Sequence, residues 1–329
     1  MGLTKPPKAR QGSVLASVMR ALFGAVLIAI MGGFLWALSI ATGVEAAENI
    51  DPIITAPGQI LNVGDLAIHI REEGSENQPP VLLLHDFDVA GGYQWLDTTE
   101  FLAGYRLVIP DMVGFGYSSR LAEIGRSHTV IGRAESMALL LERLEIDSLS
   151  VVGAGYGGMV AAQLAALRPD LVENLVLVSP EIFGPSPRWY QRLQGWPVLG
   201  EAYTFTVYGA SVGASSRYAA GCEEGGWCPD GEALAERDVT ARVRGTTAAF
   251  NAFASTPAAT TLPGALSSIS APTLVLWGED DDLTPLGDGE EVAAAIPGAS
   301  LTVVPGTGHR PHLEEPAVTA GFIVAFLAR

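Results

Sequence analysis

The longest apolar run lies near the N-terminus, where residues 21–40 contain no charged side chain. As a helix rising about 1.5 Å per residue, this run spans the roughly 30 Å hydrocarbon core of a bilayer. The apolar core of a signal peptide is shorter, at roughly 7 to 15 residues, so the length predicts an uncleaved membrane anchor. A cleaved signal segment is the alternative, because Val44, Glu45 and Ala46 offer a small-residue cleavage site.

The charges around this run predict its orientation. Residues 1–46 carry four basic side chains, Lys5, Lys8, Arg10 and Arg20, against Glu45 alone. Basic flanks stay on the cytoplasmic side of the cytoplasmic membrane, so the body is expected on the extracytoplasmic side. If the segment is cleaved, the body is expected to be secreted or periplasmic. We therefore expect a cytoplasmic basic segment at 1–20, a transmembrane anchor or signal segment at 21–40 and a linker at 41–57.

Beyond the linker, short apolar runs alternate with helical patterns. The runs predict strands at 66–70, 81–84, 106–109, 149–152, 175–178, 273–277 and 301–304, and the helical patterns cover 130–144, 156–167, 289–295 and 317–327. Strand and helix alternation of this kind builds a mostly parallel sheet flanked by helices. Such a sheet places its ligand site at the carboxyl ends of the strands.

One segment, 181–263, interrupts this alternation and is rich in aromatic residues. It leaves the sheet after one strand and returns before the next, so we interpret it as an inserted cap. The core is then formed by 58–180 together with 264–329. Most of the aromatic residues of the cap are expected to pack in its interior, and some to line a substrate pocket.

Charge and cysteine content narrow the classes of partner. With 19 Lys and Arg against 36 Asp and Glu, the net charge is −17, which argues against nucleic acid as a partner. The two cysteines, Cys222 and Cys228, predict a local disulfide in an exported chain, with two unpaired thiols as the alternative. They lack the further ligands that zinc requires, and no two histidines have metal-ligand spacing, so we expect neither a metal nor a cofactor.

Four motifs occur in the order typical of one large family. They are LLLHDFD at 82–88, IPDMVGFGYSSR at 109–120, VVGAGYGGMVAAQLAAL at 151–167, and the pair LVLWGEDDDLTP and PGTGHRPHLEEP at 274–285 and 305–316. From about residue 57 to the C-terminus the chain resembles the capped α/β hydrolases of the serine type. The resemblance implies an α/β-hydrolase fold with an inserted, mainly helical cap, here preceded by a transmembrane helix.

The nucleophile position departs from the family pattern. The elbow motif G-x-S-x-G places a serine on a sharp turn between a strand and a helix. Here the pattern falls on residues 153–157, and the position of the serine is held by Gly155. No neighbouring residue supplies another nucleophile, so the position is vacant and conventional serine hydrolysis is not expected.

The other catalytic positions of the family are present. By resemblance, His309 is the general base, Asp281 orients it, and the amides of Phe87 and Tyr156 form the oxyanion hole. Asp280 and Asp282 are alternative acids at the same loop.

Several further residues lie near these motifs. Asp86 replaces a family glycine and places an anion beside the hole, although we expect Asp86 and Asp88 to be solvated loop acids rather than a replacement nucleophile. Glu181 stands where some relatives carry a relocated acid, but we interpret it as the start of the cap. His312 is expected to be a surface or capping residue at a helix start.

Three interpretations of the function follow from this pattern. The first is a membrane-tethered, non-hydrolytic or strongly impaired relative that binds a small apolar or ester-like ligand, or a protein partner. The second is a hydrolase or lyase-type enzyme in which His309 and Asp281 act without a covalent intermediate. A third reading makes Gly155 a variant of an ordinary serine hydrolase.

Overall fold

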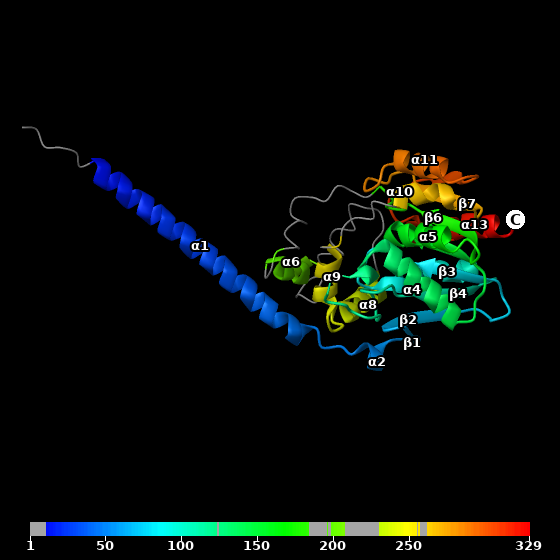
Figure 1. The fold of residues 1–329 in the computed structure, drawn as a ribbon, viewed down its shortest axis with the longest axis horizontal. Coiled ribbons are helices and arrows are strands. Elements are labelled where there is room, and N and C mark those ends of the chain that lie inside the picture. The colour runs from blue at the N-terminus through cyan, green and yellow to red at the C-terminus, as the bar shows by residue number, and fades with distance from the viewer. Residues whose placement is uncertain are drawn as a thin grey trace, which may run out of the picture.

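The computed structural model describes residues 11–123, 125–183, 199–207, 230–254 and 262–329, together with Trp196 and Thr256 (Figure 1). Cys222 and Cys228 lie outside the described residues, and the disulfide between them stays a prediction. Most of the aromatic residues noted between 189 and 227 also lie outside them.

An eight-stranded sheet forms the centre of the body. The strands are β1 (Gln59–Val63), β2 (Leu66–Glu73), β3 (Pro80–Leu84), β4 (Arg106–Pro110), β5 (Leu149–Ala154), β6 (Val172–Val178), β7 (Thr273–Gly278) and β8 (Ser300–Val304). Their order is β1-β2-β4-β3-β5-β6-β7-β8, antiparallel at β1-β2 and β2-β4 and parallel elsewhere. All seven predicted strands are confirmed. The pattern missed β1, because this edge strand buries only Val63 fully and lacks a continuous apolar run.

Helices cover both faces of the sheet, as the alternation predicted. On one face the buried core includes residues of α4 (Val130–Arg143), α5 (Gly155–Leu167) and α11 (Leu286–Ala295). On the other face, α13 (Pro316–Leu327) packs with the short helices around Trp95, which are η1 (Gly91–Trp95), α3 (Leu96–Thr99) and η2 (Glu100–Leu102). The two layers hold the strand ends rigidly, so that loops leaving the carboxyl ends meet at one edge.

Every described element between β6 and β7 is helical. These helices are α6 (Leu199–Val207), α8 (Gly231–Ala241), α9 (Thr246–Ala254), α10 (Leu262–Ala265) and the short 3-10 helix η5 (Leu266–Ser268). Figure 1 shows α6, α8 and α9 grouped beside the sheet, on the side from which α1 departs, and α6 contacts both α9 and α1. The boundaries of the cap at 181 and 263 stay a prediction.

The N-terminal helix α1 (Gln11–Ala47) is longer than the expected segment 21–40 and projects away from the body (Figure 1). Its part from Ala16 to Ala47 has a mean hydropathy of 2.3 in its most apolar window and leaves large side chains such as Phe23 and Trp36 exposed. The length and composition suit a membrane span or a signal sequence.

The segment after α1 is attached to the helices between β6 and β7. Glu48 is 4% exposed, and its two carboxylate oxygens accept hydrogen bonds from the amides of Gly245 (2.8 Å) and Thr247 (2.7 Å) at the start of α9. Two residues later, Ile50 forms a parallel bridge with Val243. No sequence pattern predicted this junction, because its two sides lie 197 and 199 residues apart in the two hydrogen-bonded pairs.

Candidate active site

The elbow between β5 and α5 is formed without its nucleophile. Gly155 is the first residue of α5 and has a φ of +48°, in the left-handed region. A side chain at this angle is strained by about 1 to 3 kcal/mol, whereas glycine adopts it at little cost. The turn therefore has the left-handed backbone of the expected elbow, and Gly155 at its apex supplies no side chain.

The carboxylate of Asp86 occupies the space that this side chain would need. A Cβ atom built on Gly155 would overlap the Oδ1 and Cγ atoms of Asp86. Asp86 follows β3 and is 2% exposed, and Asp88 is 7% exposed. The expectation that both are solvated loop acids is wrong, because the loop after β3 turns inward across the carboxyl end of β5.

Asp86 also occupies the oxyanion hole expected from the resemblance. Its Oδ1 accepts a hydrogen bond of 2.9 Å from the amide of Tyr156. Burial alone would raise the pKa of Asp86, but Arg310, His309 and the amides of Tyr156 and Phe87 outweigh burial and hold this pKa far below its usual range. The amides of Phe87 and Tyr156, the two predicted donors of the oxyanion hole, thus stabilise the carboxylate of Asp86.

The acid and base of the expected triad lie in contact. His309, in the loop after β8, places Nδ1 2.9 Å from Oδ2 of Asp281, in the loop after β7. Asp281 also accepts hydrogen bonds from the amides of Leu283 (3.0 Å) and Thr284 (2.9 Å), and from the Thr284 hydroxyl (2.8 Å). Asp281 is thereby fixed, whereas Asp280 and Asp282 are exposed.

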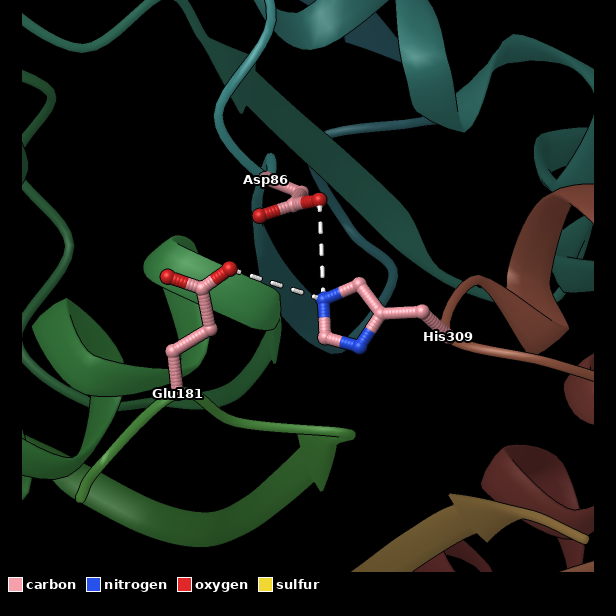
Figure 2. Close-up of side chains that lie close together, drawn as sticks. All are labelled: Asp86, Glu181 and His309. Carbon is pink, nitrogen blue, oxygen red and sulfur yellow. Dashed lines mark ion pairs between the residues drawn. The ribbon is translucent and has the colours of Figure 1, made fainter. Parts of the chain in front are cut away.

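The second ring nitrogen of His309 faces two further carboxylates, as Figure 2 shows. Its Nε2 lies 3.6 Å from Oε1 of Glu181 and 3.9 Å from Oδ2 of Asp86. Burial alone would lower the pKa of His309, but the hydrogen bond to Asp281 and the charges of Glu181 and Asp86 raise it to about 10. At neutral pH His309 is therefore an imidazolium.

Glu181 and Arg310 complete the charged cluster, and neither role was expected. Glu181 lies just after β6, and its carboxylate faces His309. Its position in the sequence had indicated only the start of the cap. Arg310 donates from Nε to Oδ2 of Asp86 at 3.1 Å. Adjacency to His309 in the sequence was the available signal for Arg310.

An aromatic cluster lies beside the charged groups. Phe253 of α9 packs against Phe87 and Tyr156, with ring centroids 4.7 and 5.1 Å apart, and Phe250 packs against Phe87 at 5.2 Å. The two residues that carry the hole amides thus have their side chains covered by α9.

Two other histidines have structural roles. His312 is fully buried, stacks on Trp95 at 4.5 Å and has its pKa lowered to about 3 by burial. Its expected position on the surface is therefore wrong. His69 pairs with Asp111 through Nδ1 and Oδ2 at 2.7 Å, and Asp111 also accepts the amides of Gly92 and Tyr117. This pair holds the loop after β4 and was missed because His69 lies on β2 and Asp111 follows β4, 42 residues later in the sequence.

Known proteins resemble this architecture closely. The family model for the alpha/beta hydrolase fold matches residues 79–316. The chain belongs to the α/β-hydrolase family. A 2-hydroxy-6-oxononadienedioate/2-hydroxy-6-oxononatrienedioate hydrolase of Cupriavidus pinatubonensis is 28% identical over 80% of this chain and 91% of its own length. A 2-hydroxymuconate semialdehyde hydrolase of a Pseudomonas species is also 28% identical, over 76% of this chain and 87% of its own.

Among solved structures, the crystal structure of a bacterial membrane phospholipase A is similar to this chain with a TM-score of 0.66. It shares 26% identity and covers 94% of this chain and 98% of its own. The enol-lactonase of Burkholderia xenovorans has a TM-score of 0.67 at 21% identity, covering 82% of this chain and 100% of its own, and shows the same fold.

Proposed function

We propose that this chain is a non-hydrolytic relative of the α/β hydrolases that binds a ligand or a partner at the former active site. The observation that carries the proposal is the position of Asp86. Its carboxylate fills the space above Gly155 and accepts the hydrogen bond of the Tyr156 amide.

This arrangement opposes acyl transfer at two points. The step requires a nucleophile at the elbow, and position 155 has no side chain. It also requires hydrogen-bond donors free to stabilise the negative oxygen of a tetrahedral intermediate. A permanent carboxylate in that hole excludes the substrate oxygen and repels its developing charge.

Catalysis by His309 and Asp281 alone is less well supported than binding. A general base must be neutral at the working pH, and the three surrounding carboxylates raise the pKa of His309 to about 10. The imidazolium is suited to donating a hydrogen bond rather than to removing a proton from water.

The surroundings favour a ligand with two unlike ends. The half-buried rings of Phe87 and Phe253 offer an apolar surface, while Asp86 and Glu181 offer hydrogen-bond acceptors. An ester-like ligand would have to bind away from the filled hole. A group that donates hydrogen bonds or carries positive charge fits the carboxylates directly.

The N-terminal helix supports a membrane location for this binding function. In our proposal α1 anchors the chain in the cytoplasmic membrane, with the four basic residues before its apolar segment 21–40 inside and the body on the extracytoplasmic side. The similarity to a bacterial membrane phospholipase A is consistent with that location.

A fluorophosphonate probe tests the loss of covalent hydrolysis. The purified full chain in detergent with EDTA should stay unlabelled and should not turn over a short-chain ester. The double variant Asp86→Gly/Gly155→Ser is the positive control, because it restores the hydroxyl and empties the hole. We expect this variant to be labelled at residue 155.

Two results would contradict the proposal. Labelling of the natural chain at another serine, with ester turnover at an ordinary esterase rate, would place the elbow elsewhere. A natural activity abolished by His309→Ala but insensitive to the probe would establish the enzyme that uses His309 and Asp281 alone.

A further inference from the structure

Three potential metal ligands converge on one point, although their spacing in the sequence gave no sign of it. The Oδ2 atom of Asp86, an Oε atom of Glu181 and Nε2 of His309 all lie within 4.8 Å of one another (Figure 2). They come from the loops after β3, β6 and β8, which meet at the carboxyl edge of the sheet.

The histidine is oriented as a metal ligand is oriented. Its Nδ1 is hydrogen-bonded to Asp281, which is the carboxylate–histidine arrangement that fixes a ligating imidazole and raises its basicity. Its Nε2 is buried, points between the two carboxylates and makes no hydrogen bond within the described residues. The side chain is 9% exposed, so a cation bound at Nε2 would be largely shielded from bulk water.

The distances suit a small divalent cation. Ligand bonds of 2.0 to 2.2 Å in a tetrahedron separate the ligand atoms by about 3.4 Å. The observed separations from Nε2, 3.6 Å to Glu181 and 3.9 Å to Asp86, need to contract by a few tenths of an ångström. The two carboxylate oxygens lie within 4.8 Å of each other and would close around the ion. Two carboxylates also balance the charge of such an ion.

We propose that Asp86, Glu181 and His309 bind a divalent transition metal such as Zn²⁺ or Co²⁺, with an open fourth position facing the ligand site. The metal replaces the Nε2 proton of the His309 imidazolium, and this proton is released to solvent. The inference rests on the proposed binding function and gives that site a definite ligand class. Arg310 competes for the same position, because its Nε pairs with Oδ2 of Asp86 at 3.1 Å. The Arg310 side chain is one-quarter exposed, and metal binding requires its guanidinium to turn away from Asp86.

The probes are Zn²⁺ and Co²⁺ added to the untagged full chain after EDTA treatment and dialysis. We expect one equivalent by calorimetry and a Co²⁺ visible spectrum of nitrogen and oxygen ligation. Asp86→Asn and Glu181→Gln should each weaken binding at least about tenfold. Asp280→Asn and Asp282→Asn are matched controls on a nearby exposed loop and should leave binding unchanged.

Arg310→Gln supplies the sharpest result, because it should strengthen binding by removing the competing cation. Thermal melting establishes that each variant is folded. The metal site would be overturned if neither the folded natural chain nor folded Arg310→Gln bound the metal. It would also be overturned if metal binding were unchanged in both Asp86→Asn and Glu181→Gln. Neither result bears on the fluorophosphonate experiment, which tests only whether the chain performs covalent hydrolysis.

A second inference rests on different contacts, those between the end of α1 and α9. The carboxylate of Glu48 accepts the amides of Gly245 and Thr247, which α9 leaves without partners at its N-terminus. From the same helix, Phe250 and Phe253 pack on Phe87, and Phe253 also packs on Tyr156. One short helix therefore joins the exit of the N-terminal helix to the residues of the oxyanion hole.

We infer that Glu48 is a positioning residue that couples the N-terminal helix to the candidate site through α9. Asn49 and Ile50 reinforce the junction, through Arg242 (2.9 Å) and through the bridge with Val243. Loss of the Glu48 carboxylate should let α9 move away from Phe87 without disturbing the far edge of the sheet.

Peptide-resolved hydrogen exchange on the full chain in detergent tests this coupling. Glu48→Ala should accelerate exchange roughly fivefold or more in α9 and in the loop that contains Phe87, while β7 and β8 stay unchanged. Glu45→Ala, at an exposed position on α1, is the matched control and should have no effect. Unchanged exchange in α9, or equal acceleration throughout the chain, would overturn the inference.

Discussion

The two sides of the candidate site hold their charged groups in different ways. On the side of β7 and β8, Asp281, Thr284 and His309 form a dense hydrogen-bond network. On the side of β3 and β5, Gly155 has no side chain, and the carboxylate of Asp86 from the neighbouring loop occupies the space above it. The first side holds the imidazole of His309, and the second holds an anion that faces it.

The contacts of Asp86 show why the residues at 86 and 155 belong together. Without the Asp86 side chain, the space above Gly155 would be empty and the amide of Tyr156 would lose its acceptor. An unpartnered buried amide costs about 1 to 3 kcal/mol, and the Asp86 carboxylate removes that cost for the amide of Tyr156. The residues at positions 86 and 155 are therefore complementary, and a change at one constrains the other.

The largest expected effect breaks that complementarity. Gly155→Ala adds a methyl group at a φ of +48° and against the Asp86 carboxylate, so we expect a loss of about 2 to 5 kcal/mol in the free energy of unfolding. In the Asp86→Gly background the same substitution should cost only the backbone strain, about 1 to 3 kcal/mol. Denaturant titration of the four chains gives the coupling energy. Equal losses in both backgrounds would show that Asp86 does not fill the position.

The same contact predicts why restoring serine alone is insufficient. Gly155→Ser should remain unlabelled by the fluorophosphonate probe, while the double variant with Asp86→Gly reacts. A serine-type site without its nucleophile typically retains only about 10³ to 10⁴ of rate enhancement over water. We therefore expect the double variant to show a large increase in probe labelling over the natural chain. Mass spectrometry of the labelled peptide measures it, and full reactivity of the single variant would contradict the clash.

A smaller effect concerns pH and the network on the other side. The folded-state pKa of His309 is raised to about 10 from an ordinary value near 6.5, so its contribution to stability is fully present below pH 6.5. We expect this contribution to be lost as the pH rises from about 6.5 to about 10. The metal-free natural chain and His309→Gln should therefore differ in the slope of unfolding free energy over this window. Parallel slopes would mean that His309 is not charged in the folded state.

The smallest expected effect tests how much of the network is redundant. Thr284→Val removes the hydroxyl that donates to Asp281 at 2.8 Å but keeps the two loop amides and His309 as donors. We expect a loss of about 1 kcal/mol, with the slope in pH unchanged. Thermal and denaturant unfolding measure both quantities. A loss as large as that of Gly155→Ala would show that this side is no more tolerant than the other.

The sequence alone determined the fold and most of the elements. Continuous apolar runs such as 149–152 and 273–277 predicted buried parallel strands. The motif order predicted the family to which the chain belongs. These features are local or depend on motif order, so they need no knowledge of distant contacts. The edge strand β1 was missed because one buried residue carries too little pattern.

The tertiary structure decided what the site contains. Whether Asp86 is solvated or buried depends on how the loop after β3 turns against Gly155, which lies 69 residues away and leaves no periodic signal. The positions of Glu181, Arg310 and Glu48 were decided in the same way, by loops that meet only when the sheet forms. Local sequence patterns specify which face of an element is buried, but the electrostatics of a cluster depend on distances between elements, and those distances exist only in the folded chain.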